Sequence, residues 1–168
     1  LDDAQDRVSV AVHDWRSATT CSFRSAITHD SASIVKVTTV ATLLWQRAEA
    51  GRSLSVTEKR WAEAAITISD NAAQSALWSR IGGNDGAAEF MQAAGMNRSA
   101  PVASDKWGLT QVTAADELRL LRTLTHGSLL RPADRDYLLG LMRRVDQTQR
   151  WGVPIGAPAG STVAVKNG

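Results

Sequence analysis

The 168-residue chain is 43% hydrophobic and carries a net charge of only +2, which suits one globular domain with a real core. No basic run exceeds two residues, whereas a nucleic-acid-binding surface concentrates positive charge. Cys21 is the sole cysteine, which excludes an internal disulfide, and no apolar run approaches the roughly 18 residues of a membrane span. Composition therefore disfavours nucleic-acid binding and membrane insertion.

Two short strands are predicted near the N-terminal end of the chain. Residues 7–14 alternate apolar and polar side chains, which is typical of a half-buried strand. After a plausible turn, residues 19–23 form a second β-prone run. The two segments are therefore expected to form a hairpin.

A block of helices is predicted next. From Ser33, apolar residues recur at helical spacing until Gly51, which suits a helix end. Ser55 and Glu58 fit a capping box that opens a second helix, running to Ile68. Periodicity and capping residues predict further helices over 72–81, 85–94, 113–125 and 132–145. Residues 97–112 and 147–160 lack periodicity and are predicted to be loops, and 161–165 form a β-prone run.

The order of these elements predicts a single domain of the α/β (α+β) class. Strands occupy residues 1–30, a helical region covers 31–150, and a final strand is expected over 161–168. An antiparallel sheet flanked by a mostly helical block is the natural way to bury both kinds of element.

Three short motifs occur in a fixed order along the chain. Ser33 and Lys36 form an S-x-x-K motif at a predicted helix start, Ser-Asp-Asn follows at 69–71, and Lys-Asn-Gly ends the chain at 166–168. The spacing places Ser33 and Lys36 on one helical face, one turn apart. A serine hydroxyl needs a neighbour to take its proton, and a lysine whose pKa is lowered by burial and nearby positive charge can do so. Each motif alone also fits a structural role: a helix cap, a solvated lysine, or a turn.

Together the motifs resemble the signature of class A β-lactamases and penicillin-binding proteins. The resemblance extends from residue 7 to 168 and is close over 64–83, 90–96 and 113–124. It implies a β-lactamase/transpeptidase-like fold and an exported protein acting on a β-lactam or a peptidoglycan-like peptide, without a cofactor or metal. It also implies the following roles: Ser33 as nucleophile, Lys36 as base, Ser69 as proton carrier to the leaving nitrogen, and Asn71, Lys166, Asn167 and Gly168 as substrate-binding residues.

The chain departs from this family in the loop that should carry a general-base glutamate. There is no Glu between Glu89 and Glu117, and the 97–112 loop offers only Asp105. Asp105 is a candidate replacement base, or it forms an ion pair with Lys106 or a nearby arginine. We therefore expect acylation of Ser33 with slow deacylation, as in a penicillin-binding, peptidase-like or esterase-like hydrolase, and a poor β-lactamase.

Two further departures concern the cleft and the end of the chain. The interval between Ser33 and Ser69 is shorter than in class A enzymes, which predicts a more open cleft. Family members continue past the third motif with two strands and a helix, and one oxyanion-hole N–H follows the motif's glycine. We therefore expect a fragment whose sheet is completed by another segment or a second chain. The alternative function is a weak or inactive binding or scaffold protein of the cell envelope.

Overall fold

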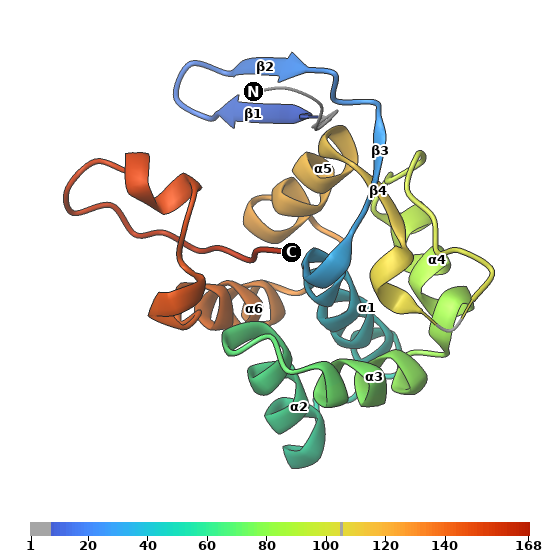
Figure 1. Ribbon diagram of the computed structural model, residues 1–168. Coiled ribbons are helices and arrows are strands. Elements are labelled where there is room, and N and C mark those ends of the chain that lie inside the picture. Colours follow the sequence, from blue (N-terminus) through green and yellow to red (C-terminus); the bar gives the residue numbers. More distant parts are fainter. Residues whose placement is uncertain (1–7, 105) are drawn as a thin grey trace.

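The computed structural model describes residues 8–104 and 106–168 (Figure 1). The strands are β1 (Val10–Asp14), β2 (Thr19–Phe23), β3 (Thr28–Asp30) and β4 (Gln111–Thr113). The helices are α1 (Val35–Glu49), α2 (Val56–Thr67), α3 (Asn71–Arg80), α4 (Gly83–Ala93), α5 (Ala114–Thr125) and α6 (Pro132–Arg143). Short 3-10 turns cover Ala32–Ile34, Trp107–Leu109, Gln147–Gln149 and Val153–Gly156.

The predicted hairpin is confirmed. β1 pairs with β2 in an antiparallel register from Val10 opposite Phe23 to Asp14 opposite Thr19. The hairpin lies over α5 at one end of the molecule (Figure 1). Its turn is attached there because the Trp15 ring stacks on that of His126, with the centroids 3.8 Å apart.

A second antiparallel pair joins β3 to β4, and neither strand was predicted. His29 lies opposite Val112, and an isolated bridge links Ala100 to Gln111. The prediction of a loop throughout 97–112 is therefore wrong at its C-terminal end. Each strand is only three residues long and forms because a distant segment completes its hydrogen bonds, which local periodicity does not reveal.

The centre of the helical block is α1, which packs against α2, α3, α4 and α6. Its first ten residues, 35–44, are all buried, including Lys36. Leu43 and Phe90 are completely buried in this core, and burying a side chain of this size contributes about 1.5–3 kcal/mol. The start of α1 is therefore fully enclosed by the core.

The N-terminal caps fix where the helices begin. The Ser55 side chain accepts from the Glu58 amide while Glu58 accepts from the Ser55 amide, so the predicted capping box is confirmed. Thr113 caps α5 by accepting from the Asp116 amide. Asp70 caps α3 by accepting from the Ala73 amide at 2.6 Å. The last cap sets the orientation of the second motif.

The expected strand over 161–168 does not form. No described segment pairs with these residues as a strand, since the two sheets consist of β1 with β2 and of β3 with β4. The segment is held instead by single contacts: the Val165 amide donates to the Met142 carbonyl at 3.1 Å, and Arg150 donates to the Val163 carbonyl at 3.1 Å. Its end reaches the start of α1 at the centre of the molecule (Figure 1).

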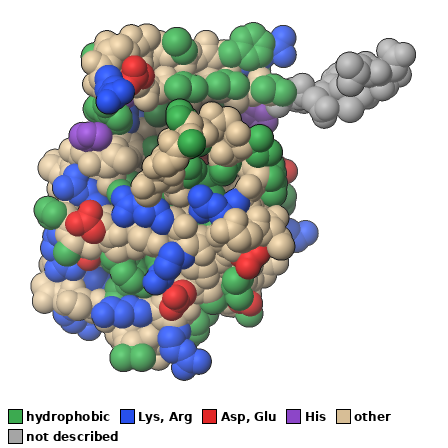
Figure 2. Space-filling model, turned by 90° about the vertical axis from the view of Figure 1, so that its left-hand side faces the viewer, with side chains coloured by type: hydrophobic (Ala, Val, Ile, Leu, Met, Phe, Trp, Pro, Cys, Tyr) green, Lys and Arg blue, Asp and Glu red, His purple; other side chains and the backbone are tan. Residues whose placement is uncertain are grey.

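The charged side chains are dispersed over the surface. On the face in Figure 2, lysine and arginine side chains are more frequent than aspartate and glutamate, but they are scattered among other atoms and form no continuous basic patch. None of the helices in 8–104 and 106–168 has the length and apolar character needed to cross a bilayer.

Candidate active site

Ser33 lies on the 3-10 turn Ala32–Ile34 that leads into α1. The turn is attached to the 97–112 loop because the Ser31 amide donates to the Thr110 carbonyl at 2.9 Å. Ala32 adopts a left-handed conformation with φ of 44°, which directs the chain sharply into the helix. Ser33 is half-buried, so its hydroxyl is held at the surface end of the most enclosed helix.

Lys36 is completely buried one turn after Ser33, and its ammonium is directed at the second motif. Its Nζ donates to the Ser69 carbonyl at 2.5 Å, to Ser69 Oγ at 3.1 Å and to Asn71 Oδ1 at 2.8 Å. These three acceptors match the three donors of an ammonium group. The structure therefore brings Lys36, Ser69 and Asn71 together, as their sequence motifs suggested.

Burial lowers the pKa of Lys36 to about 8, against a smaller opposing effect of the Asp70 carboxylate. An ordinary lysine has a pKa of 10.5. At a pKa of about 8, roughly one-tenth of Lys36 side chains are neutral at pH 7, and only the neutral amine can accept a proton.

Lys166 approaches the same hydroxyl from the C-terminal segment. Its Nζ donates to Ser69 Oγ at 3.0 Å, to the Asn167 carbonyl at 2.9 Å and to Asn167 Oδ1 at 3.3 Å. Burial and, to a smaller extent, the charge of Lys36 together lower the pKa of Lys166 to about 8. Ser69 Oγ thus accepts from two lysines, which leaves its own proton free to be donated elsewhere.

The backbone of the second motif is shaped to make this contact. Ser69 has φ of 58°, a left-handed conformation that is uncommon for a residue with a side chain. The Asp70 amide donates back to the Ala64 carbonyl at the end of α2. Between this bond and the Asp70 cap of α3, the Ser69 carbonyl and hydroxyl both face Lys36.

Gly168 lies against the nucleophile turn. A Cβ atom built on Gly168 would lie 3.1 Å from the Ser31 carbonyl oxygen and 3.3 Å from Ala32 Cβ, tighter than an ordinary contact. A side chain at this position would therefore crowd the turn that carries Ser33, which favours glycine at the end of the third motif. Asn167 contributes through its contacts with Lys166, and Asp105 lies outside the described residues.

Trp107 is part of the site, although the sequence places it only in the aperiodic 97–112 loop. Its ring centroid lies 5.1 Å from Lys36 Nζ, within cation–π range. Its Nε1 donates to Ser75 Oγ at 3.1 Å, which ties the 97–112 loop to α3. No local sequence pattern marks this contact, because it depends on how the loop folds over α1.

Two cavities flank the lysine cluster. One, of about 580 Å³, is lined by Trp107, Ser75 and Asp85 among others. The other, of about 480 Å³, lies among α5, α6 and the C-terminal segment, and its lining includes Glu117 and Lys166. Its walls are mostly apolar, formed by residues such as Ile34, Val37, Leu120, Met142 and Trp151.

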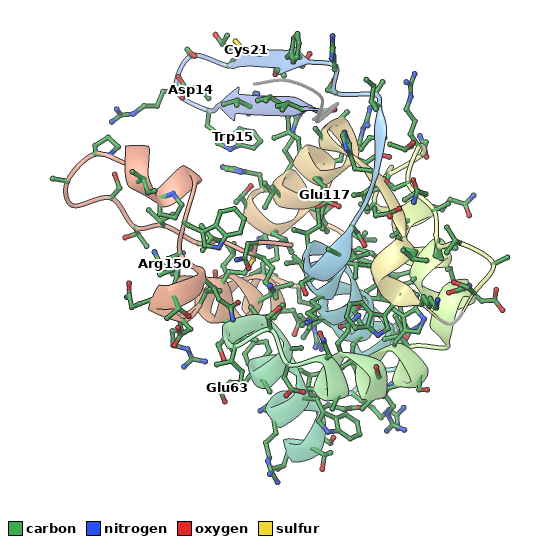
Figure 3. All side chains as sticks on the ribbon, in the orientation of Figure 1. Asp14, Trp15, Cys21, Glu63, Glu117 and Arg150 are labelled. Carbon is green, nitrogen blue, oxygen red and sulfur yellow. The ribbon has the colours of Figure 1, made fainter. Side chains whose placement is uncertain are left out.

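Glu117 was not expected in the interior. Its side chain extends from α5 into the molecule (Figure 3), and its Oε1 has no hydrogen-bond partner among the described residues. Burial and, to a smaller extent, the neighbouring Asp116 carboxylate together raise its pKa to about 7. The helical pattern gives no warning of this, because acids near a helix N-terminus are common on surfaces.

The described residues contain no group of three or more His, Cys, Asp or Glu side chains arranged to hold a metal ion. The lysine cluster itself brings together two lysines with lowered pKa values, the Ser69 hydroxyl and the Asn71 amide.

This arrangement of motifs and helices belongs to the class A β-lactamase fold. The structure superposes on a class A β-lactamase from Mycobacterium abscessus with a TM-score of 0.81 and 20% identity, covering 94% of this chain and 72% of that one. A variant of the reconstructed class A β-lactamase of the last common ancestor of Gram-negative bacteria gives a TM-score of 0.78 at 24% identity, covering 94% and 71%. The expected fold, with small antiparallel sheets beside a helical block, is confirmed.

The family model "Beta-lactamase enzyme family" matches residues 54–168, and the chain belongs to that family. A relative named "Putative lipoprotein LppW", from Mycobacterium bovis and Mycobacterium tuberculosis, is 30% identical over 96% of this chain. The chain spans about half the length of these curated relatives, 53%.

Proposed function

We propose that the chain carries the acylating centre of a serine hydrolase, in which Ser33 is acylated by a β-lactam or a peptidoglycan-like peptide. The observation that carries the proposal is the contact of Ser69 Oγ with both Lys36 and Lys166 beside the turn that holds Ser33. Two lysines with lowered pKa values around one hydroxyl are the arrangement expected of a proton-transfer centre.

The proposed acylation begins with neutral Lys36. Ser33 Oγ attacks the substrate carbonyl, and its proton passes to Lys36 Nζ as the C–O bond forms. When the C–N bond breaks, the leaving nitrogen takes the Ser69 hydroxyl proton, and Ser69 regains a proton from Lys36. Lys36 is neutral again at the end of the step, and the product is an ester of Ser33.

The remaining motif residues are proposed to bind the substrate. Asn71 uses Oδ1 to accept from Lys36, which leaves its amide nitrogen available to a substrate carbonyl. Lys166, as an ammonium, would bind the substrate carboxylate, while Asn167 and Gly168 hold the segment beside the nucleophile. A small-molecule or peptide substrate with a carboxylate therefore fits this centre.

Deacylation is proposed to be slow. Asp105 is the only acid in the 97–112 loop, and an aspartate is one methylene shorter than the glutamate of class A enzymes. Trp107, from the same loop, covers Lys36 with an apolar ring in place of a group that could activate water. The acyl-enzyme should therefore persist, as in a penicillin-binding protein or peptidase.

We further propose an exported protein of the cell envelope, because a relative sharing 30% identity is named as a lipoprotein. Another segment or a second chain is proposed to complete the sheet. The free edge of β1 and the segment 161–168 both lack a strand partner among residues 8–104 and 106–168.

Intact-mass spectrometry after incubation with a fluorescent penicillin tests the acylation. The protein should gain the mass of one penicillin, and the adduct should persist for hours. Ser33→Ala should abolish the adduct, whereas Ser79→Ala, an exposed serine on α3, should leave it unchanged. An unmodified wild-type protein would favour the binding or scaffold alternative, and rapid turnover of nitrocefin would contradict slow deacylation.

A further inference from the structure

Trp107 occupies a defined place over the buried lysine. The turn Trp107–Leu109 packs against the turn Ala32–Ile34 that carries Ser33. Thr110 Oγ1 donates to the Trp107 carbonyl at 2.7 Å, and the Trp107 indole N–H donates to Ser75 Oγ at 3.1 Å. Hydrogen bonds therefore hold both the backbone of Trp107 and the edge of its ring, and the ring centroid lies 5.1 Å from Lys36 Nζ.

This geometry has a specific electrostatic consequence. The face of an indole ring carries negative charge density that attracts an ammonium, most strongly when the pair is removed from water. A neutral amine gains much less from the same contact. Lys36 is completely buried, and this burial favours its neutral form. The ring acts in the opposite direction, because it stabilises the ammonium form of Lys36.

We propose that Trp107 is a positioning residue for Lys36: its indole face holds the ammonium against Ser69 and Asn71 and sets the pH above which Lys36 can accept a proton. The last clause rests on the proposed function, in which that proton comes from Ser33. The contact between the indole face and the Lys36 ammonium is seen in the structure itself, and its effect on Lys36 is tested without any substrate.

The other charges around Lys36 are the same with or without the indole. Asp70 faces Lys36 from the N-cap of α3 and favours the ammonium, while Lys166 shares Ser69 Oγ with it from the C-terminal segment. Lys106 precedes Trp107 and is exposed, and Asp105 lies outside the described residues. A substitution of Trp107 by an apolar residue therefore isolates the effect of the ring.

Lysine NMR provides the direct measurement. The chain has only four lysines, at positions 36, 59, 106 and 166, so a sample labelled with ¹³C at lysine Cε gives four resonances, assignable by Lys→Arg variants. In Trp107→Met, which keeps an apolar cover without a π face, the Lys36 titration midpoint should fall by about half a unit to one unit. In Trp107→Phe, which keeps a weaker π face, the fall should be smaller.

Controls separate this effect from a general loss of packing. Trp45→Met makes the same substitution farther along α1, where Trp45 packs against Phe90, and should leave the Lys36 midpoint unchanged. Ser75→Ala, which removes the acceptor of the indole N–H, should lower the Lys36 midpoint by less than Trp107→Met does.

A Lys36 midpoint that stays in place or rises in both Trp107→Met and Trp107→Phe would overturn the proposal. If Trp107→Met does not fold, Trp107→Phe and Ser75→Ala still decide it. The pH profile of penicillin labelling should shift downward in parallel with the Lys36 midpoint. Absence of labelling in wild-type protein would reject the proposed function, yet the NMR midpoint would still show whether Trp107 acts on Lys36.

Discussion

The two lysines that meet at Ser69 Oγ are supported in very different ways. Lys36 lies in the first turn of the central helix, with ten successive buried residues around and after it. Lys166 lies on a segment without a strand partner among the described residues, held by isolated hydrogen bonds from Val165 and Arg150. The two lysines lie at nearly the same distance from one hydroxyl, one on a fully buried helix turn and the other on a half-buried segment with few hydrogen bonds. We therefore expect the first to be rigid and the second to be more loosely attached.

This difference suits two separate roles, proton transfer for Lys36 and substrate binding for Lys166. A proton-transfer group must stay within hydrogen-bond reach of its partner, and α1 and the capped start of α3 provide this for Lys36. A substrate-binding group can adjust as the substrate enters, and the C-terminal segment allows this for Lys166. Substitutions should therefore separate a chemical effect on one side from a binding effect on the other.

The largest effect is expected from Lys36→Met. Loss of the proton acceptor should reduce the rate of Ser33 labelling by at least about 100-fold, while the apolar replacement keeps the volume filled and the fold intact. Lys166→Met should instead reduce labelling by about 10-fold to 100-fold, because it removes a charged hydrogen bond used in binding. Labelling rates at several penicillin concentrations distinguish the two. If both variants lost the same labelling rate with the same dependence on penicillin concentration, the separate roles of Lys36 and Lys166 would be contradicted.

The next effect concerns the stability of the helical side, meaning the helices packed around α1 as opposed to the C-terminal segment 161–168. Glu58 is almost fully buried and binds both Arg47, at 2.5 Å, and Arg80, at 2.8 Å, which holds its pKa far below the usual range. Glu58→Ala would leave Arg47 buried without a partner and should lower the free energy of unfolding by about 3 kcal/mol in urea titrations. Glu63→Ala, which breaks an exposed pair with Arg144, should cost no more than about 0.5 kcal/mol.

The sequence predicted the helical side far better than the C-terminal side. The start of α2 follows from Ser55 and Glu58 and that of α5 from Thr113, because a cap and a helical period act within a few residues. The strand pair β3–β4 and the unpaired segment 161–168 depend on which distant segments meet, and no local pattern records this.

The candidate site divides in the same way. Ser33, Lys36 and Ser69 were found because their motifs are short and contiguous, and the structure brings Lys36 and Ser69 together. Trp107 and Glu117 were missed, because each owes its role to burial against an element far away in the chain. Distinguishing a buried glutamate from a solvated one requires the fold itself.

A pH-dependent effect is expected at the boundary between the two sides, where Glu117 lines the 480 Å³ cavity. Its pKa is about 7 in the folded chain and 4.5 as the ordinary value, so the folded state binds more protons between these limits. Stability contributed by this group is therefore present below pH 4.5 and is lost as the pH rises through 7.

Glu117→Gln removes this titration while keeping the shape of the side chain. The variant should be more stable than wild type at pH 8 by up to about 3 kcal/mol and should lose most of that advantage at pH 4.5. Thermal unfolding at both pH values measures the difference. A difference between variant and wild type that does not change with pH would show that Glu117 is solvated in the folded protein.

The smallest global effect is expected from Arg150→Ala, which acts on the loosely attached side alone. Arg150 donates to the Arg143 and Val163 carbonyls, so its loss should free the C-terminal segment from the end of α6. Global stability should fall by less than about 1 kcal/mol, because few buried apolar contacts depend on it. The Val165 amide, bonded to the Met142 carbonyl, should exchange with solvent faster, while amides in the buried first turns of α1 keep their protection.

Arg144→Ala is the matched control, since Arg144 pairs with exposed Glu63. If amide exchange accelerated equally in α1 and at Val165, the two sides would unfold as one unit, and the contrast between a rigid and a loosely attached lysine would not hold.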